Sequence, residues 1–439
     1  MMSSTNTAEQ LWEIVRQARW FGGKGRPGGL RALTELAVLP GEPPVSVMIA
    51  EVGYDDHAPG AEPDLEHYQV PVVVTGSEVT DATADPAALK VIMDRVLAAG
   101  LRPEDPDDPV QVRLVDSTGL APDLPAVRFG GEQSNTSIMY GEVAMLKLFR
   151  RLELGRNLDI EVHDVLSRTD SPAARAAAHL FGWVEGTWTT GAGDPVTADL
   201  AMLVERLTDV HDGWALAQQA CRDGRSFTDE ATALGRALRD VHDALATSFS
   251  TATVPGASTA AAMRARLERA VVVAPALTAY TERLAAVFGA VADQPVAVQR
   301  IHGDFHLGQA LVAGTGSRAG WKIIDFEGEP LKTLAERMEP DAVVRDVAGA
   351  LRSFDYAGTA DPSSVGRSWV RACRAAFVAG WVGGRAGALD PTERALLRAY
   401  EADKAVYEVV YETRNRPDWV QIPLSGIRVL VEPEPGGTA

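Results

Sequence analysis

Two short segments near residue 300 carry carboxylates and an amide at spacings suited to catalysis. Residues 301–309 are IHGDFHLGQ, and residues 321–330 are WKIIDFEGEP. Transfer of a phosphoryl group needs an acid that orients the attacking hydroxyl, together with oxygen ligands for the metal ions that neutralise the phosphates. Asp304 fits the first role, with His302 beside it in the same loop. The second role fits the hard oxygen donors that Mg²⁺ prefers, which here are Gln309, Asp325 and Glu327.

Two other interpretations of these segments remain open at this stage. Alternate residues of a strand share a face, so His302, Asp304 and His306 could hold a transition metal. No cysteine or further histidine cluster lies near these three residues in the sequence. A metal site made of them would also leave Asp325 of the second segment without a role. The acids could also simply cap turns, which requires two separate features to coincide. Phosphoryl transfer accounts for both segments together.

A nucleotide site is predicted upstream of these loops. Lys147 lies in the apolar run 145–149 (MLKLF), and Glu161 begins a helical pattern at 158–162 (LDIEV), as expected for a phosphate-binding lysine held by an acid. Either residue alone would more often be a solvated surface charge. The turn at 130–137 (GGEQSNTS) precedes the lysine where a phosphate-covering loop belongs, although it is not GxGxxG and an ordinary hairpin would look alike. The predicted nucleotide contacts in that turn are Gln133, Ser134, Asn135, Thr136 and Ser137.

Further ligand contacts are predicted at a hinge and near the C-terminus. The run 201–206 (AMLVER) could grip adenine through Val204 and Glu205, although a plain buried strand predicts the same residues. Sugars present apolar patches and vicinal hydroxyls, which favours flat aromatic side chains beside acids, amides and guanidinium groups. A C-terminal set at helical spacing has this composition, although a surface helix with ion pairs such as Lys404 with Glu408 is the alternative. The predicted acceptor residues are His306, Arg345, Lys404, Tyr407, Glu408, Tyr411, Arg414 and Asn415.

The elements that would position these residues fall into three regions. Strands are predicted at 45–52 and 68–75 and a helix at 87–98, before a Pro/Asp stretch at 103–109. A glycine-bearing hairpin follows at 126–149. Beyond residue 200 helical patterns dominate at 230–247, 259–289, 364–380 and 391–412, with β-structure at 297–326. We expect an N-terminal cap over residues 1–105, a β-rich nucleotide-binding lobe and hinge over 106–208, and a mainly helical lobe with the catalytic loop, metal loop and sugar site over 209–439.

Bulk properties restrict the class of partner and the compartment. The chain has 439 residues and a formal net charge of −18, which argues against a sequence-independent hold on nucleic acid or anionic lipid. The two cysteines, Cys221 and Cys373, lack the spacing of a zinc or redox site. No signal-peptide pattern and no long apolar run is present, so a cytoplasmic protein that does not bind membranes is predicted.

Six segments together carry a resemblance to a known family. They are residues 19–26 (RWFGGKGR), 131–137 (GEQSNTS), 147–151 (KLFRR), 301–309, 325–330 (DFEGEP) and 407–417 (YEVVYETRNRP). On these segments the chain resembles the actinobacterial maltokinases, relatives of the aminoglycoside phosphotransferases. The resemblance implies an α+β, bilobal protein-kinase-like fold with an N-terminal α/β cap subdomain. The hinge departs from it, because residues 204–207 (VERL) are less apolar than the family pattern, and so does the short stretch between residues 53 and 68.

The resemblance also implies an activity. ATP with Mg²⁺ would phosphorylate the anomeric hydroxyl of maltose, giving maltose 1-phosphate and ADP. The product would feed α-glucan and glycogen synthesis from trehalose-derived maltose, and an association with trehalose synthase is implied. Two alternatives remain: a related kinase acting on glucosamine, an aminoglycoside or an amino alcohol, and a non-catalytic nucleotide-binding scaffold for a trehalose-metabolising partner. The intact set of Lys147, Asp304, Gln309 and Asp325 argues against the scaffold.

Overall fold

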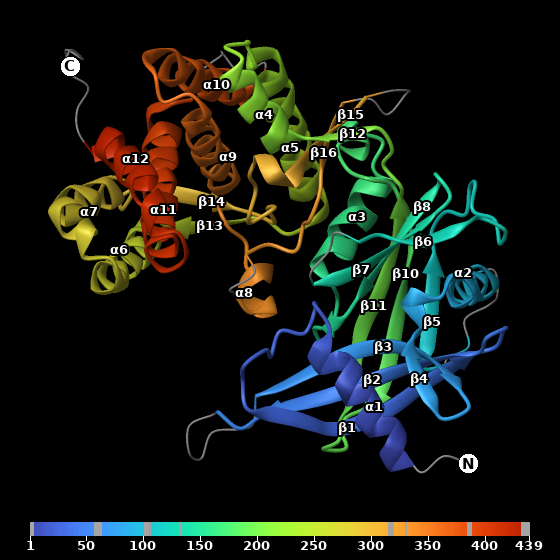
Figure 1. Cartoon of the computed structure of the whole chain (residues 1–439). Helices are drawn as coiled ribbons and strands as arrows, with labels where there is room; N and C mark the ends of the chain where they lie inside the picture. The colour runs from blue at the N-terminus through green and yellow to red at the C-terminus, as the bar shows by residue number, and fades with distance from the viewer. Residues whose placement is uncertain are drawn as a thin grey trace, which may run out of the picture. The chain divides into compact units, whose positions relative to one another are not determined.

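A computed structural model describes residues 4–56, 64–100, 105, 107–130, 134–314, 320–329, 332–383 and 389–431. The chain divides into two compact units, both drawn in Figure 1. Unit 1 comprises Met1–Asp164 with Ala178–Thr208, and unit 2 comprises Val165–Ala177 with Asp209–Ala439. Mixed helices and sheets build both units, which confirms the predicted α+β class.

An antiparallel sheet with two helices begins unit 1. Its strands follow in the order β1-β2-β3-β4, and the predicted strands at 45–52 and 68–75 are β2 and β3. Helix α1 buries Leu11 and Val15 in the same apolar cluster as Val52, Tyr68 and Val70 of the sheet, so it covers one face (Figure 1). The elements are α1 (Ser4–Gln17), β1 (Gly28–Leu39), β2 (Val45–Tyr54), β3 (Leu65–Thr75), β4 (Glu78–Asp81), a 3-10 turn η1 (Ala82–Ala84) and α2 (Pro86–Gly100).

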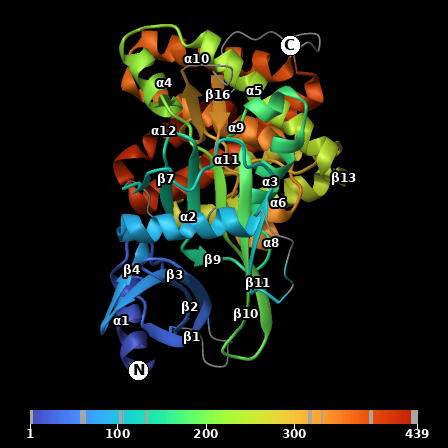
Figure 2. The ribbon, with the colours of Figure 1, turned by 90° about the vertical axis from the view of Figure 1, so that its right-hand side faces the viewer.

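A second antiparallel sheet carries the predicted hairpin and hinge strand. Its strand order is β5-β10-β11-β8-β7-β6, which places the lysine strand β8 between β7 and β11. Apolar side chains from both sheets and from α2 form one continuous core. Figure 2 shows α2 extended along the second sheet. The elements are β5 (Val110–Leu114), β6 (Ala126–Arg128), β7 (Asn135–Tyr140), β8 (Ala144–Phe149), β9 (Arg151–Leu152), α3 (Leu158–Arg168), β10 (Leu180–Thr189) and β11 (Pro195–Glu205).

The predicted cap and nucleotide-binding lobe therefore belong to one compact unit. The two-residue strand β9 follows β8 of the second sheet in sequence but pairs with β3 of the first sheet. Just before it, the fully buried Arg150 donates to Asp81 at 2.8 Å and to Thr136 at 2.8 Å, which joins β4 to β7. A buried guanidinium needs such partners, because desolvation of an unpaired charge is costly. This cross-connection joins the predicted cap to the predicted nucleotide-binding lobe within unit 1.

Unit 2 is mainly helical with two small sheets. The predicted helices at 230–247, 364–380 and 391–412 are confirmed as α5, α10 and α11. The predicted helix at 259–289 is interrupted, because Pro275 cannot continue the α-helical hydrogen-bond ladder and a 3-10 segment begins there. The elements are β12 (Val210–Asp212), α4 (Gly213–Arg222), α5 (Thr228–Ser248), β13 (Ala252–Pro255), α6 (Gly256–Val273), η3 (Pro275–Tyr280), α7 (Thr281–Gly289), β14 (Pro295–Val298), η4 (Leu307–Gln309), β15 (Ala310–Ala313), β16 (Gly320–Ile323), α8 (Leu334–Met338), α9 (Val344–Ala357), α10 (Ser364–Val382), α11 (Pro391–Asn415) and α12 (Gln421–Val431).

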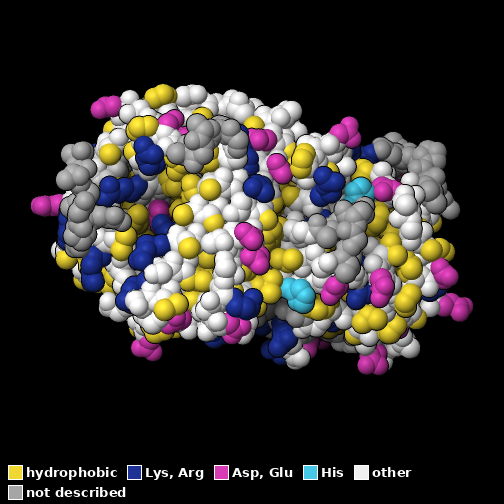
Figure 3. Space-filling view, turned by 90° about the horizontal axis from the view of Figure 1, so that it is seen from above, with side chains coloured by type: hydrophobic (Ala, Val, Ile, Leu, Met, Phe, Trp, Pro, Cys, Tyr) yellow, Lys and Arg dark blue, Asp and Glu magenta, His cyan; other side chains and the backbone are white. Residues whose placement is uncertain are grey.

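The surface and the helices agree with the bulk properties of the sequence. Within the described part of the chain, no helix combines the length and the apolarity needed to cross a membrane. Figure 3 shows acidic and basic side chains interspersed among apolar ones on the face that it presents.

Candidate active site

A buried carboxylate fixes the backbone of the loop that carries Asp304. Asp346, in the first turn of α9, accepts the backbone N–H groups of His302 and Gly303, each at 2.8 Å, and His242 Nε2 lies 2.9 Å from it. Burial opposes ionisation of this carboxylate, but its hydrogen bond with His242 lowers the pKa of Asp346 below its ordinary value. A charged acceptor thus fixes the backbone just before the predicted catalytic acid.

Asp304 itself is accompanied by a cation. Lys404 Nζ, from the middle of α11, donates to Asp304 Oδ1 at 3.0 Å, and both side chains are about one quarter exposed. Burial alone would lower the pKa of Lys404, but the neighbouring Asp304 raises it, so the ammonium keeps its charge. The pair brings together two predicted site residues that are 100 positions apart in sequence. The alternative pairing of Lys404 with Glu408 is not the one seen, because Glu408 is held by Arg352.

The histidines of the loop stabilise its conformation. His302 is buried, with Nε2 3.0 Å from the carbonyl oxygen of Ile324, which connects the loop to the segment before Asp325. His306 caps η4, where its Nδ1 accepts the N–H of Gly308 at 3.0 Å. Burial lowers the pKa of His306, which favours its neutral form. Both rings have backbone partners, and the predicted catalytic role of His302 and acceptor-binding role of His306 stay predictions.

The predicted metal residues lie together in unit 2. Gln309 Nε2 donates to Asp325 Oδ2 at 3.0 Å, which leaves the amide oxygen of Gln309 available as a ligand. Asp325 has a φ of 65°, a left-handed conformation that is uncommon for a residue with a side chain and that concentrates at functional sites. Glu327 follows it in the same turn. An amide oxygen beside carboxylates is a donor set that fits Mg²⁺, so Gln309, Asp325 and Glu327 are the residues that would hold it.

Two glycines allow the catalytic and metal loops to approach closely. Gly303 has a φ of 87°, and a Cβ built on it would lie 3.3 Å from the Cα of Gly328. Gly328 also has a positive φ, of 74°. Only glycine adopts such backbone conformations without strain while leaving room for a second backbone. The sequences HGD and EGE therefore contain the glycines because the two loops pack against each other.

The lysine of β8 meets an acid that sequence analysis did not select. Lys147 Nζ donates to Asp159 Oδ2 at 2.9 Å. Asn157 caps the N-terminus of α3 by accepting the N–H of Asp159 at 2.9 Å, and Asp159 and Glu161 both lie in the first helical turn. Burial opposes ionisation, but Lys147 and His163 lower the pKa of Asp159 well below its usual range. The predicted partner Glu161 thus lies on the correct helix, and Asp159 is added as a contact of the lysine.

Several residues predicted for the phosphate loop and the hinge lie within strands β7 and β11. Gln133 lies outside the described residues, and Ser134 is exposed just before β7. Strand β7 begins at Asn135, so Thr136 and Ser137 are buried strand residues rather than turn residues, and Thr136 Oγ1 accepts a bond from Arg150. At the hinge, Val204 is buried in β11. Glu205 ends that strand, and its carboxylate accepts the N–H of His179 at 3.3 Å.

The predicted acceptor residues of α11 lie along one helix, with different environments. Tyr407 and Tyr411 stack with ring centroids 6.5 Å apart, and Tyr411 is 42% exposed. Arg414 and Asn415 are exposed at the end of the helix, where Asn415 donates to the carbonyl oxygen of Tyr411 at 2.9 Å. On α9, the Arg345 guanidinium donates to Asp341 at 2.7 Å and to Glu329 at 2.6 Å. The two tyrosines offer the flat faces that carbohydrate binding uses, whereas Arg345 braces the segment after the metal loop.

A buried ion network lies between α9, α10 and α11. Arg352 is almost fully buried and donates to Glu408 at 2.7 Å and 2.9 Å and to Asp355 at 2.6 Å. Arg374 extends the network to Glu401 at 2.6 Å. Burial raises the pKa of Glu408, and Arg352 opposes that shift. The predicted acceptor residue Glu408 is therefore held by an arginine from the opposite helix.

Comparisons with known proteins agree with this geometry. Residues 15–99 match the family profile of the maltokinase N-terminal cap domain. The chain is 29% identical over 393 residues to a glucosamine kinase of Streptacidiphilus jiangxiensis, covering 78% of this chain and 85% of that one. It is 27% identical over 328 residues to a glucosamine kinase of Mycolicibacterium smegmatis, covering 69% and 78%. A solved glucosamine kinase structure (crystal form B) is 25% identical with a TM-score of 0.69, covering 96% of this chain and 99% of that one.

The fold, the anchored acid loop and these relatives define the class: the chain is a kinase with a protein-kinase-like fold. More particularly, the chain is similar to the maltokinase cap domain over residues 15–99 and to glucosamine kinases over most of its length, which confirms the resemblance predicted from the sequence.

Proposed function

We propose that the protein transfers the γ-phosphate of ATP to a hydroxyl of a small sugar, with the anomeric hydroxyl of maltose as the first candidate acceptor. The products would be ADP and maltose 1-phosphate. The observation that carries the proposal is the ion pair of Asp304 and Lys404 above the backbone anchored by Asp346. It supports the proposal because it offers a carboxylate held by a cation, and phosphoryl transfer needs an acid that orients the attacking hydroxyl.

The chemistry divides between groups of the two units. In unit 1, Lys147 held by Asp159 would bind the phosphates of the nucleotide, with Glu161 in the same helical turn. In unit 2, Asp304 would accept a hydrogen bond from the sugar hydroxyl and take its proton as the new O–P bond forms and the bond to the ADP oxygen breaks. Mg²⁺ held by Gln309, Asp325 and Glu327 would supply positive charge that neutralises the phosphate oxygens.

The charges around the acceptor acid favour a neutral sugar. Asp304 and Glu408 are the two carboxylates that a cationic acceptor would be expected to seek among the predicted site residues. Each already has a cation, Lys404 at 3.0 Å and Arg352 at 2.7 Å. A second ammonium placed beside Lys404 would meet like-charge repulsion in a partly desolvated setting. The stacked Tyr407 and Tyr411 support a ligand with apolar sugar faces.

Glucosamine is the second candidate acceptor, and the whole-chain likeness to glucosamine kinases favours it. Its amino group need not lie beside Lys404 if another hydroxyl is the one that reacts. The maltose proposal draws on the cap domain and on the charge argument, whereas the glucosamine proposal draws on the length of the similarity. An association with trehalose synthase stays a prediction.

One experiment distinguishes these acceptors. ADP release from ATP with Mg²⁺ would be measured with maltose, glucosamine, glucose and an aminoglycoside offered separately, and phosphorus NMR would identify each product. Release with maltose and an anomeric phosphate signal is the expected result. Release with glucosamine alone would retain the kinase and replace the acceptor, while ADP release with none of the four would contradict the sugar-kinase proposal.

A further inference from the structure

Unit 1 contains a cavity that the proposed reaction does not use. Its volume is about 590 Å³, and it lies between the end of α1, the β4–α2 connection and the edge strand β6 with the start of β7. Trp20 and Arg19 of the segment RWFGGKGR line it, so this family-like segment has a place in the structure without a role in phosphoryl transfer. A segment of this kind calls for a function of its own.

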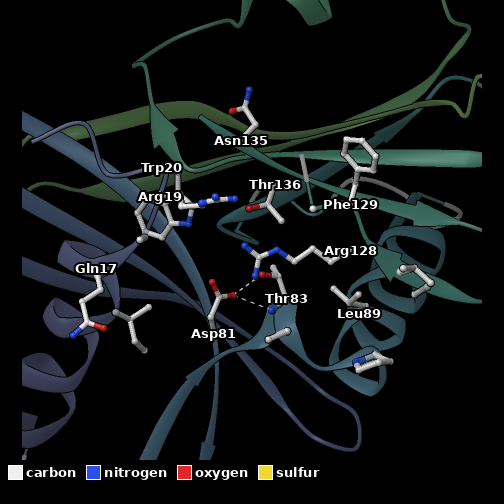
Figure 4. A pocket seen from close by; sticks show the side chains of 17 residues that line it. Gln17, Arg19, Trp20, Asp81, Thr83, Leu89, Arg128, Phe129, Asn135 and Thr136 are labelled. Carbon is white, nitrogen blue, oxygen red and sulfur yellow. Dashed lines mark hydrogen bonds between the residues drawn. The ribbon is translucent and has the colours of Figure 1, made fainter. Parts of the chain in front are cut away.

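Two guanidinium groups extend into this cavity from opposite sides, as Figure 4 shows for Arg19 and Arg128. Among the residues that the structure describes, neither side chain has an ion-pair partner. Behind the cavity wall lies Arg150, which is fully buried and whose partners Asp81 and Thr136 line the cavity. Asp81 is thus the one carboxylate beside the guanidinium groups of Arg19, Arg128 and Arg150 among the described residues that line or back the cavity. This local excess of positive charge occurs in a chain whose overall charge is −18.

The charge balance of this cavity is unfavourable without an anion. Burial lowers the pKa of Arg150; Asp81 counters this shift, and the positive charge of Arg128 adds to it. The Nη1 atom of Arg150 is buried and has no hydrogen-bond partner among the described residues. An anion near Arg128 would relieve the repulsion between the guanidinium groups of Arg128 and Arg150. Convergent guanidinium groups are also the preferred partners of phosphate, because their forked donors match its oxygens.

The remaining lining is suited to an organic ring. Phe129 is 52% exposed and Val127 is 62% exposed, so both present apolar surface at the cavity that they line. The indole of Trp20 lies on the opposite wall, and Gln17 and Asn135 add hydrogen-bonding groups (Figure 4). A volume of this size accommodates a small metabolite rather than a lone ion.

We propose that this cavity is a second ligand site, specific for a phosphomonoester that carries a ring, either a sugar phosphate or a nucleoside monophosphate. The phosphate binds between Arg19 and Arg128, and the ring lies against Phe129. Phe129 follows β6 and Asn135 begins β7, so an occupant contacts both the β4–α2 connection and the two strands that precede the lysine strand. The proposal does not depend on which sugar the kinase phosphorylates.

The test is a calorimetric titration of the full chain with glucose 6-phosphate, AMP or inorganic phosphate, with ADP saturating the nucleotide site. The variants are Arg19→Gln, Arg128→Gln and Phe129→Ala, whose side chains are exposed, so that folding is retained. Arg16→Gln is the matched control, because this exposed arginine of α1 pairs with Glu13 away from the cavity.

We expect at least one of the two esters to bind the wild-type protein more tightly than inorganic phosphate. Its affinity should fall at least tenfold in each arginine variant and stay unchanged in the control. The Phe129 variant should bind the ester more weakly than the wild type and bind inorganic phosphate with unchanged affinity. The proposal is overturned if neither ester binds, if both arginine variants bind it as the wild type does, or if inorganic phosphate binds as tightly as the esters.

Discussion

Replacing Asp346 by asparagine should both destabilise unit 2 and disable the catalytic loop. One carboxylate oxygen accepts the N–H of Gly303, and the other serves His302 and His242. Asparagine has a single acceptor oxygen, so at least one buried donor loses its partner and the remaining bonds lose their charge assistance. With hydrogen bonds to charged groups contributing about 1.5–3 kcal/mol each and neutral ones about 1 kcal/mol, the free energy of unfolding should fall by roughly 3–5 kcal/mol.

The assay is urea unfolding followed by tryptophan fluorescence, in parallel with turnover. Trp381 reports locally, because its Nε1 donates to His242 Nδ1 at 3.1 Å. The matched control is Asp243→Asn, an exposed acid on the same helix as His242, which should change the free energy of unfolding by less than about 0.5 kcal/mol. If the Asp346 variant unfolds like the control and retains wild-type turnover, the anchoring role assigned to this carboxylate is wrong.

Three further predictions concern charge, backbone conformation and pH. Lys404→Met should lower kcat at least roughly tenfold, equivalent to about 1.4 kcal/mol, and should improve glucosamine relative to maltose as acceptor; an unchanged ratio of kcat/KM values would contradict the charge argument. Gly303→Ala should cost about 1–2 kcal/mol of unfolding free energy because of its φ of 87°, with Gly29→Ala, which meets open space, as control. Burial raises the pKa of Asp199 to about 6, so the folded chain retains a proton that the unfolded chain releases, and stability should fall as pH rises from about 4 to 6; urea unfolding of Asp199→Asn should lack that slope.

Much of the site could be predicted because its residues are local in sequence. The spacing within 301–309 and 325–329 fixes which side chains one loop presents, and the structure brings Gln309 and Asp325 into contact as the pattern indicates. The long helix α11 follows from its apolar periodicity, and with it the shared face of Lys404, Glu408 and Tyr411. Local rules thus placed residues on the correct elements.

Contacts between elements were beyond the reach of such rules. Asp159 and Glu161 lie in the same helical turn, and the contact of Asp159 with Lys147 depends on how α3 packs against β8, which the sequence of α3 alone does not give. The start of β7 at Asn135 likewise depends on pairing with β8, so residues 135–137 of the predicted turn belong to a strand. A two-residue strand such as β9 leaves no periodicity in the sequence, although its pairing with β3 joins the cap to the second sheet.

Buried charges were the hardest feature to predict from the sequence. Asp346 and Arg352 look like surface residues of an amphipathic helix, yet both are almost fully buried on the packed face of α9. The sequence partly indicates their burial, because the segment VRDVAGALRSF places these charges among small and apolar residues. A charged residue within an otherwise apolar face predicts a buried partner, but the partners His242 and Glu408 lie far away in the sequence.

We assign Asp304 to the acceptor hydroxyl of the proposed kinase reaction, and the variant Asp304→Asn removes that carboxylate. Turnover with the best acceptor and the affinity for ATP would be measured on the same preparations of wild-type and variant protein. Loss of a general base predicts a fall in kcat of about 10²–10⁴-fold with ATP affinity unchanged, because the acid contacts the acceptor and not the nucleotide. Retention of turnover, or a parallel collapse of ATP affinity, would contradict the role assigned to this residue.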